Sequence, residues 1–404
     1  MKGDREAPAR SNSIRVLREA NRYLVYQCVM KEGPLSVERL IRLTGLSRPT
    51  VLHLLRDLMD SEIIVKDGFA DSATVGRSAS LLNLNRQNHF ALGIDFEFPA
   101  IRMAIANMKN DILAEESFLF PENMEGEALK ELFYARVEAF VASSGVDRSK
   151  IDGAGLGISG VIDSAAGVSL SIERIRGWKN VPVQADLERI LGVPVYVRND
   201  VHLLGMVEKA LYLPGDFNDF IYVAVRTGIG SITYQHGRAM RGEKGNAGFI
   251  GHTIIIPRGR RCHCGSCGCL ETYAGQTAIA NAYLTCSHEP VSFDEVIRRA
   301  EAGETLAVQT LRDAGFYLGI ALANLVKTFE IPEIVIGGNP ALGGSPFITA
   351  AEEALREYST DSLNLDIRIR AGQLREDQYP LGGCHLVMEH RMDRPRLSLQ
   401  PAKN

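Results

Sequence analysis

Four cysteines within eight residues are the strongest chemical signal in this chain. Cys262, Cys264, Cys267 and Cys269 are separated by glycines and small residues, and His252 lies ten residues upstream in a Gly-Phe-Ile-Gly-His segment. A thiolate-rich set selects zinc or an iron–sulfur centre over magnesium or calcium. One imidazole and three of the four thiols would complete the tetrahedral shell of a structural zinc site. The alternative is four reduced thiols in a flexible loop, although cysteines rarely cluster without a bridge or a metal.

Length and composition indicate a protein of more than one domain. The chain has 404 residues, of which 45% are hydrophobic, so it can bury a full core. It shows no signal peptide and no long apolar span. We therefore expect a cytoplasmic protein with reduced thiols, no disulfides and no membrane contact.

Charge is divided unevenly along the chain. Residues 1–88 hold 14 Lys and Arg against 10 Asp and Glu, a balance of +4, whereas the whole chain carries −4. The remainder therefore carries −8. A basic segment joined to an acidic body indicates that contact with nucleic acid is confined to the first segment.

The first segment has the pattern of a helix-turn-helix. Apolar residues recur at helical spacing over 12–30, and Gly33-Pro34 ends that helix. Ser36 and Ser47 have the side chains of N-cap residues for two further helices. A short turn at 44–46, with glycine at its centre, connects these two helices, which is the helix-turn-helix arrangement.

Two expected strands complete a wing after the third helix. Residues 63–65 and 80–84 have strand character, and we expect a polar turn at 66–68 between them. Gly76-Arg77 then lies at or near the base of the wing. A small helical bundle that binds protein is the alternative, but the basic balance and the wing favour DNA.

Six side chains of this segment are candidates for DNA contact. The N-terminal half of the third helix exposes polar and basic side chains that can reach base edges and phosphates in a major groove. An arginine of the wing can enter a minor groove. The candidates are Ser47, Arg48, Thr50, His53, Arg56 and Arg77.

After residue 88 the pattern changes to that of an α/β body. Several apolar runs end in polar or glycine-rich turns and pass into helices, which is typical of mixed sheets whose ligands gather at the carboxyl ends of the strands. The expected strands are 90–95, 101–106, 153–158, 193–197, 220–225 and 334–336, and a long helix is expected over 126–143.

The order of the polar turns resembles that of one protein family. Along the chain come the Asn199-Asp200 pair, a Thr-Gly-x-Gly turn at 227–230, the Gly-x-x-Gly-His segment at 248–252, the cysteine cluster closing on Glu271, and Gly337-Gly338. Over nearly its whole length the chain resembles the ROK family, which contains bacterial sugar kinases and sugar-responsive repressors. The N-terminal head resembles the repressor branch, which includes regulators of xylose, N-acetylglucosamine and glucose genes.

The resemblance implies a winged helix-turn-helix followed by a two-lobed body like that of actin and hexokinase. We expect the DNA-binding domain at 1–86 and the kinase-like body at 87–404. Within the body, lobe one is expected at about 87–202 with a C-terminal helix at about 380–392, and lobe two at about 203–379.

The resemblance also assigns site residues. His252, Cys262, Cys264 and Cys269 match the zinc ligands of the family. Cys267 is then an extra thiol or a competitor for one coordination position, and His263 is a bystander. Five residues match sugar contacts of the family: Asn199, Asp200, His252 and Glu271 through their side chains, and Gly160 through its backbone. Phe249 stands at the position of a further contact and completes the expected effector site. In the kinases the aspartate equivalent to Asp200 is the catalytic base, and a helix N-cap is the simpler explanation for it.

Two departures from the family pattern argue against kinase activity. The kinases place Asp-x-Gly-Gly-Thr after the first strand to hold ATP phosphate, whereas this chain has Asp-Phe-Glu-Phe-Pro at 95–99. Bulky residues and proline cannot offer closely spaced N–H groups, and Glu97 repels phosphate. The family also has a sugar-binding glutamate where this chain has Phe249. Losing that acceptor should weaken sugar binding by about 1–3 kcal/mol.

We therefore expect a DNA-binding transcriptional regulator, most simply a repressor, with structural zinc and a sugar-derived effector. A head that reads one half-site implies a homodimer, or a homotetramer, on double-stranded operator DNA. No catalytic residue is expected, and Asp200 would be a vestigial base. The alternatives are an ATP-dependent sugar kinase with a DNA-binding head, and a regulator controlled by a protein partner without a small ligand.

Overall fold

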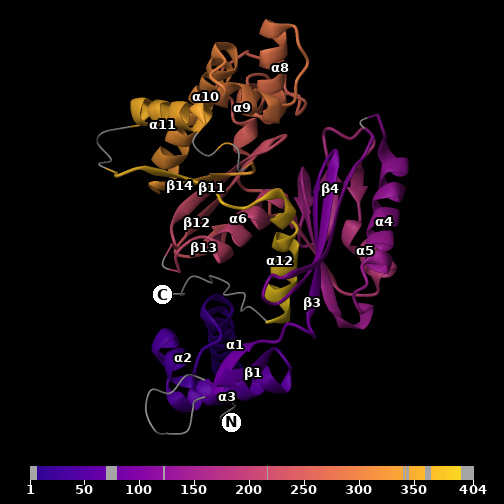
Figure 1. The fold of residues 1–404 in the computed structure, drawn as a ribbon, viewed down its shortest axis with the longest axis vertical. Coiled ribbons are helices and arrows are strands. Elements are labelled where there is room, and N and C mark those ends of the chain that lie inside the picture. Colours follow the sequence, from indigo (N-terminus) through magenta and orange to yellow (C-terminus); the bar gives the residue numbers. More distant parts are fainter. Residues whose placement is uncertain are drawn as a thin grey trace, which may run out of the picture.

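In the computed structural model the chain forms a helical head and a body built on two five-stranded sheets (Figure 1). The structure describes residues 7–69, 80–121, 123–215, 217–339, 342, 345–359 and 365–392. The wing segment 70–79, which includes Arg77, lies outside these ranges. The predicted α/β body with a helix-turn-helix head is confirmed.

Three helices form the head, at the bottom of Figure 1. They are α1 (Ala7–Glu32), α2 (Val37–Thr44) and α3 (Arg48–Asp60). Ser36 and Ser47 are the N-cap residues of α2 and α3, as predicted, and each side chain accepts a hydrogen bond from a backbone N–H three residues later. Leu40, Val51 and Leu54 are buried between the helices. Capping fixes where the two helices begin, and burial of their apolar faces fixes how they cross.

The wing consists of β1 (Ile64–Phe69) and β2 (Ser80–Leu84), which pair antiparallel. The turn predicted at 66–68 is wrong, because these residues belong to β1 and pairing continues to Phe69. The register shifts between Lys66 and Phe69, where Gly68 has a φ of 81°. Glycine adopts this angle without strain, so a signal that resembled a turn is an irregularity within the strand.

Lobe one is built on the sheet β10-β6-β3-β4-β5. Its strands are β3 (Phe90–Glu97), β4 (Ala100–Asn107), β5 (Ile112–Leu119), β6 (Ile151–Ile158) and β10 (Val195–Asn199). A small sheet adjoins them, formed by β7 (Val161–Asp163), β8 (Val168–Ser171) and β9 (Lys179–Val181). Helices α4 (Gly126–Ser143) and α5 (Val183–Leu191) cover one face, and α12 (Leu381–Arg391) packs on β3 and β6 from the other. A central strand covered on both faces is buried throughout, as β3 is.

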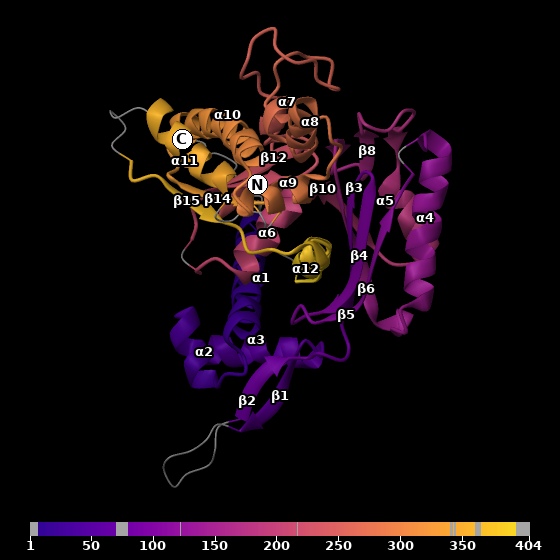
Figure 2. The same cartoon turned by 45° about the horizontal axis from the view of Figure 1, so that its top comes forward.

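Lobe two is built on the sheet β13-β12-β11-β14-β15. Its strands are β11 (Phe220–Val225), β12 (Ile229–Gln235), β13 (Arg238–Met240), β14 (Glu333–Gly337) and β15 (Arg368–Ala371). Its helices are α7 (Glu271–Ala274), α8 (Gln276–Ser287), α9 (Phe293–Glu301), α10 (Thr305–Phe329) and α11 (Pro346–Tyr358). The loop between the 3-10 turn Ile250–His252 and α7 carries the cysteine cluster and projects beyond the lobe in Figure 2.

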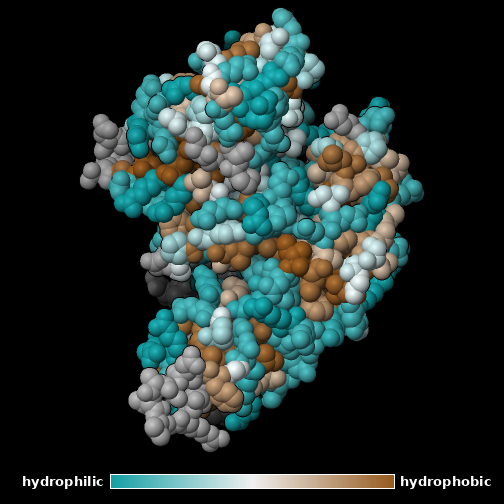
Figure 3. Space-filling model, viewed as in Figure 1, coloured by the Kyte–Doolittle hydropathy of each residue, from teal (hydrophilic) through white to brown (hydrophobic). Residues whose placement is uncertain are grey.

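Helices α6 (Asp200–Leu211) and α12 lie between the two lobes. On the face shown in Figure 3 the surface is mostly hydrophilic, and hydrophobic side chains gather across its middle, where α12 lies in Figure 1. Within the described part of the chain, no helix is both long and apolar enough to span a bilayer.

All six predicted strands of the body fall on observed strands, and the predicted helix 126–143 matches α4. Sequence reasoning missed β5, the small sheet β7-β8-β9, and β12, β13 and β15. The missed β5 is an edge strand whose residues alternate between half-buried and exposed. Such a strand carries too few apolar residues to stand out as a continuous run.

Polar contacts fix the head to lobe one. Lys109, in the turn between β4 and β5, donates from Nζ to the carbonyl oxygens of Val29 and Met30 at 3.1 Å and of Gly33 at 3.3 Å. A lysine at this position adds a charged donor to carbonyls at the end of α1 and complements the helix dipole. In the linker between head and body, His89 contacts the Ser61 carbonyl through Nε2 at 3.0 Å and Asp152 through Nδ1 at 2.9 Å. The head is therefore joined to lobe one at the ends of both α1 and α3.

Replacing Lys109 with Met should loosen the end of α1, because the carbonyls lose a charged donor. We expect the amide hydrogens of the last turn of α1 to exchange about tenfold faster, equivalent to about 1.4 kcal/mol for a charge-assisted hydrogen bond. Hydrogen exchange read by mass spectrometry measures this. Lys130→Met is the matched control, since Lys130 pairs with Glu127 on the surface of α4. Equal protection in both variants would refute the role of Lys109.

Candidate effector cleft and metal centre

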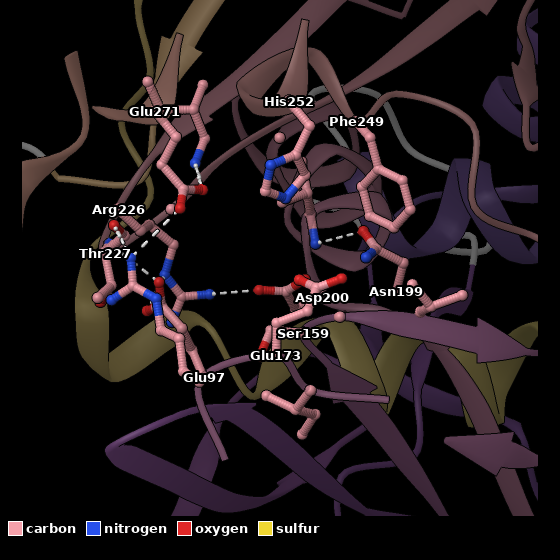
Figure 4. A pocket seen from close by; sticks show the side chains of 18 of the residues that line it. Glu97, Ser159, Glu173, Asn199, Asp200, Arg226, Thr227, Phe249, His252 and Glu271 are labelled. Carbon is pink, nitrogen blue, oxygen red and sulfur yellow. Dashed lines mark hydrogen bonds and ion pairs between the residues drawn. The ribbon is translucent and has the colours of Figure 1, made fainter. Parts of the chain in front are cut away.

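A cavity of about 240 Å³ lies where lobe one faces lobe two. Lobe one contributes the carboxyl ends of β3, β6 and β10, and lobe two contributes the turn after β11 and the segment before the cysteine cluster. All six predicted effector residues line it, namely Gly160, Asn199, Asp200, Phe249, His252 and Glu271. Figure 4 shows Phe249 and His252 on one side of this cavity, above Asn199 and Asp200. The structure thus brings together residues that are up to 111 positions apart in the sequence.

Asn199 and Asp200 stand where β10 passes directly into α6. Asn199 is the N-cap residue, and its Oδ1 accepts a hydrogen bond from the backbone N–H of Val201 at 3.1 Å. Asp200 is the first residue of the helix, so the simpler explanation of Asp200 as the cap is wrong. Because its neighbour supplies the cap, the Asp200 carboxylate is available for the cavity.

Arg226 extends across the cleft into a cluster of carboxylates. Its two terminal nitrogens contact the two carboxylate oxygens of Asp95 at 3.1 and 2.6 Å. Its Nε lies 2.8 Å from Glu97, and Nη1 lies 3.3 Å from Asp200 Oδ2. Figure 4 shows Arg226, Glu97 and Asp200 converging at the base of the cavity. All four side chains are buried.

Burial decides the charge state of this cluster. It raises the pKa of Asp200 to about 7, with Asp95 and Glu97 adding repulsion and Arg226 opposing the rise. Burial alone would lower the pKa of Arg226, but the surrounding carboxylates, Asp95 first, hold that pKa well above its ordinary value. Arg226 therefore stays cationic while Asp200 titrates near neutrality.

At the other end of the cavity, Glu271 is held by three groups. One of its oxygens accepts a hydrogen bond from the backbone N–H of Ile229 at 3.2 Å. The other lies 3.4 Å from Arg174 and 3.4 Å from Nδ1 of His263. His263, which was expected to be a bystander, therefore lines the cavity and contacts a predicted effector residue.

Gly160 brings backbone to the cavity wall where a side chain cannot fit. Its φ is 88°, and a Cβ built there would lie 2.3 Å from the carbonyl oxygen of Ser171. The Phe249 ring also lines the cavity and meets His252 edge to face at 6.0 Å. Phe249 thus gives the cavity wall an apolar surface at this point.

Four side chains converge as a possible metal centre. The ligand atoms of His252, Cys262, Cys264 and Cys269 all lie within 4.8 Å of one another, whereas Cys267 is exposed and outside the group. Nδ1 of His252 lies 3.6 Å from the Cys262 sulfur, and the sulfurs of Cys264 and Cys269 are 3.7 Å apart. Burial, together with the neighbouring thiols, raises the pKa of Cys269 to about 12. Three thiols this close need a cation before all can ionise, so the cluster can hold a metal ion.

The predicted DNA contacts lie on the exposed side of α3. Ser47, Arg48, His53 and Arg56 are exposed, and Thr50 is half-buried with its hydroxyl 2.8 Å from that of Ser47. Arg48 pairs with Glu38 of α2 at 3.1 Å. Arg77 lies outside the described residues.

Sequence reasoning missed three charged residues of the cleft. They are Glu173, Arg174 and Arg226. Arg226 immediately precedes the Thr-Gly-x-Gly turn, which drew attention to the glycines only. An arginine at the end of an apolar strand was the signal that could have marked it, because such a position is buried and requires an anionic partner.

Known proteins share this architecture in sequence and in structure. Residues 91–389 match the sequence profile of the ROK family. The xylose repressor of Caldicellulosiruptor bescii is 25% identical over 393 residues, covering 94% of this chain and 98% of the relative.

Two crystal structures share the fold. A ROK family transcriptional regulator, described as a homologue of the Escherichia coli MLC protein, superimposes with a TM-score of 0.78 at 24% identity, over 94% of this chain and 98% of its own. A ROK glucokinase from Streptomyces griseus, in complex with glucose and AMPPNP, gives a TM-score of 0.66 at 23% identity, over 74% and 99%. The expected two-lobed fold with an N-terminal head is confirmed, and this chain belongs to the ROK family.

Proposed function

We propose that this chain is a DNA-binding transcriptional regulator, acting as a repressor, whose kinase-like body senses a small sugar or sugar derivative. The observation that carries the proposal is a winged helical head, with α3 exposed, fixed to lobe one of a ROK body. The full-length likeness to a xylose repressor supports it, as does the larger share of the chain that aligns with a regulator than with a glucokinase. We also propose domain boundaries at 1–86 and 87–404, with lobe one at about 87–202 plus 380–392.

DNA recognition would use the N-terminal half of α3. Ser47, Arg48, Thr50, His53 and Arg56 face solvent there or lie at its margin, and Arg77 is proposed to enter the minor groove from the wing. The Arg48–Glu38 pair is exposed and therefore costs at most about 1 kcal/mol to exchange for a DNA contact. One head reads a half-site, so a homodimer or homotetramer on a pseudo-palindromic operator is proposed. A gel-shift assay with fragments of the source genome tests this, and an absence of specific binding would reject it.

Zinc is the metal we propose for the cysteine cluster. Thiolates at 2.3 Å from zinc in a tetrahedron are about 3.8 Å apart, and a thiolate and an imidazole are about 3.6 Å apart. The observed separations of 3.7 Å between Cys264 and Cys269 and 3.6 Å between Cys262 and His252 fit these edges. A closed set of four ligands indicates a structural role, which is to hold the loop that leads into Glu271.

The cleft suits an uncharged sugar better than its phosphate ester. Four carboxylates line it, Glu97, Glu173, Asp200 and Glu271, against the guanidinium groups of Arg174 and Arg226. The volume of about 240 Å³ is below the range of about 300–1,000 Å³ that drug-sized ligands need, so it matches a monosaccharide. Asp200, Asn199 and Glu271 would accept or donate to hydroxyls, and Phe249 would pack on an apolar ring face.

A sugar panel in a thermal-shift assay separates this proposal from control by a protein partner alone. A ligand that binds the folded state raises the melting temperature by mass action. D-xylose, D-glucose, N-acetyl-D-glucosamine and their phosphate esters are the probes. A higher melting temperature with an uncharged sugar would support a sugar effector. An unchanged melting temperature with every compound of the panel would favour control by a protein partner.

An ATP-dependent sugar kinase is the second candidate, because Asp200 lies in the cavity as a base should. Against it, the segment 95–99 presents two carboxylates and a proline, and Asp95 is already bound by Arg226. A phosphate group at this point would meet negative charge and few free N–H groups. A coupled ATPase assay with the same uncharged sugars should therefore give no turnover above background.

Replacing Cys264 with Ser should abolish metal binding, because a hydroxyl is a poor substitute for a thiolate ligand. We expect elemental analysis to give about one zinc per chain for the wild type and almost none for the variant. Cys267→Ser is the matched control, since that thiol lies outside the cluster. Unchanged zinc in Cys264→Ser, or equal loss in Cys267→Ser, would contradict the ligand set.

Replacing Arg48 or Arg56 with Ala should weaken operator binding without changing the melting temperature of the body. Each contact to a base or phosphate is worth about 1–3 kcal/mol, which corresponds to an affinity loss of about 5- to 150-fold. Arg39→Ala is the control, since Arg39 is an exposed arginine of α2 that pairs with Glu32. Quantitative gel shifts at fixed salt measure the effect, and a similar loss in the control would argue for nonspecific electrostatics.

Asp200→Asn should stabilise the protein at high pH while removing its response to sugar. The folded state raises the pKa of Asp200 from 3.8 to about 7, so the native state holds a proton that the unfolded state releases. The stability due to this proton is present below about pH 4 and disappears as the pH rises towards 7. The melting temperature of the variant should therefore exceed that of the wild type by a margin that widens from pH 5 to pH 8. A margin independent of pH would refute the assignment.

A further inference from the structure

We propose that Arg226 is a positioning residue of the effector cleft, which ties lobe two to lobe one through Asp95 and Glu97 and thereby holds the Asp200 carboxylate in place for a ligand. The ligand part of this inference rests on the proposed function of the cleft. The tie between the lobes stands on the geometry alone.

The contacts of Arg226 come from both sides of the cleft. The residue follows β11 in the sheet of lobe two, and its carbonyl accepts a hydrogen bond from the N–H of Gln276 at the start of α8. Its side chain reaches Asp95 and Glu97 of β3 in lobe one through the contacts at 3.1, 2.6 and 2.8 Å. A guanidinium that binds a carboxylate in this two-pronged way fixes both distance and orientation.

A second contact between the lobes runs beside the first. Glu97 accepts a hydrogen bond from the backbone N–H of Thr227 at 3.0 Å. The ring of Tyr379 packs against the Arg226 guanidinium, and Cζ of Arg226 lies 4.7 Å from the ring centroid. The Tyr379 hydroxyl donates a hydrogen bond to the carbonyl oxygen of Gly338 at 2.8 Å. Arg226 is thus enclosed by β3, by the turn after β11 and by the segment leading to α12, and this leaves it one orientation.

The charges explain why Asp200 depends on Arg226. Three carboxylates, Asp95, Glu97 and Asp200, meet two guanidinium groups, those of Arg226 and of Arg102, which lies 3.4 Å from Asp95. Arg102 also pairs with the exposed Glu376 at 3.0 Å, so negative charge exceeds positive charge in the cluster. Asp200 Oδ2 lies 3.3 Å from Nη1 of Arg226. A ligand hydroxyl that donates a hydrogen bond to the Asp200 carboxylate would relieve the excess charge.

Ligand binding and lobe contact would then reinforce each other. A hydroxyl on Asp200 stabilises the same ionised cluster that Arg226 requires for joining the lobes. Without Arg226, three buried carboxylates repel one another and would protonate or separate, which weakens both the bridge and the ligand site. The free energy of sugar binding would then be coupled to that of lobe closure through the Arg226 side chain.

The test compares Arg226→Gln, Arg226→Lys, Asp95→Asn and the double variant Arg226→Gln/Asp95→Asn in the full-length protein. Arg312→Gln is the control, because Arg312 pairs with Glu353 on the surface of lobe two. Hydrogen exchange is followed in peptides covering 95–99 and 226–230, together with melting temperature, zinc content and the response to the uncharged sugar panel.

We expect exchange in both peptides to be at least tenfold faster in Arg226→Gln, intermediate in Arg226→Lys and unchanged in Arg312→Gln, with zinc content unaffected. The double variant should regain part of the lost melting temperature, because two buried carboxylates instead of three are left without Arg226. It should not regain slow exchange or the response to sugar, and this split distinguishes a positioning role from a structural one.

Wild-type exchange in Arg226→Gln would overturn the proposal, as would a double variant that recovers slow exchange and sugar response along with stability. If Arg226→Gln does not fold, Arg226→Lys and the double variant decide by the same criteria. If no sugar stabilises the wild type, the effector function fails, while the exchange data still decide whether Arg226 ties the lobes.

Discussion

Burial of ionised groups between the lobes is the constraint on which the rest of this structure depends. Asp95, Glu97, Asp200 and Arg226 are all buried at the base of the cleft. A buried charge is tolerated only when it is paired and hydrogen-bonded, so each of these residues limits where the others can lie. Because the carboxylates belong to lobe one and the arginine to lobe two, the requirement for pairing also sets the relation between the lobes.

The cysteine cluster applies a second constraint to the same cleft. Its loop leads directly from Cys269 into Glu271, whose carboxylate forms the far end of the cavity. His252 belongs both to the cluster and to the cavity wall. A metal ion there would therefore stabilise the shape of the binding site without taking part in chemistry, which agrees with a closed ligand set. The body thus shares the fold of a ROK glucokinase, and we propose that its cleft binds an effector.

The head is joined to the lobe that carries the carboxylates. Lys109 contacts the end of α1, and His89 links the Ser61 carbonyl, directly after α3, to Asp152 near the start of β6. Contacts at the ends of both helices resist rotation of the head against lobe one. A change in the angle between the lobes would consequently move the head relative to lobe two, which gives a mechanical route from cleft to operator.

The sequence by itself determined several features that depend on short-range patterns. Some signals act within a few residues and can be recognised directly in the sequence. They are the caps at Ser36 and Ser47, the apolar runs of the central strands and the Asn-Asp pair at the end of β10. The spacing of the cysteines likewise marked the cluster, and the family resemblance selected the three that converge. The order of these signals carried the family resemblance, and the resemblance supplied the fold and the six predicted effector residues, all of which line the cleft.

Only the tertiary structure decided which distant groups meet. Arg226 and Asp95 are 131 positions apart, and Lys109 lies about 80 positions from the helix end that it caps. The tertiary structure also showed that residues 66–68 continue a strand and that His263 contacts Glu271. The physical reason is that the position of a charged side chain in the sequence does not specify which distant partner it will meet. The partner is decided only when folding removes the water and leaves one partner within reach.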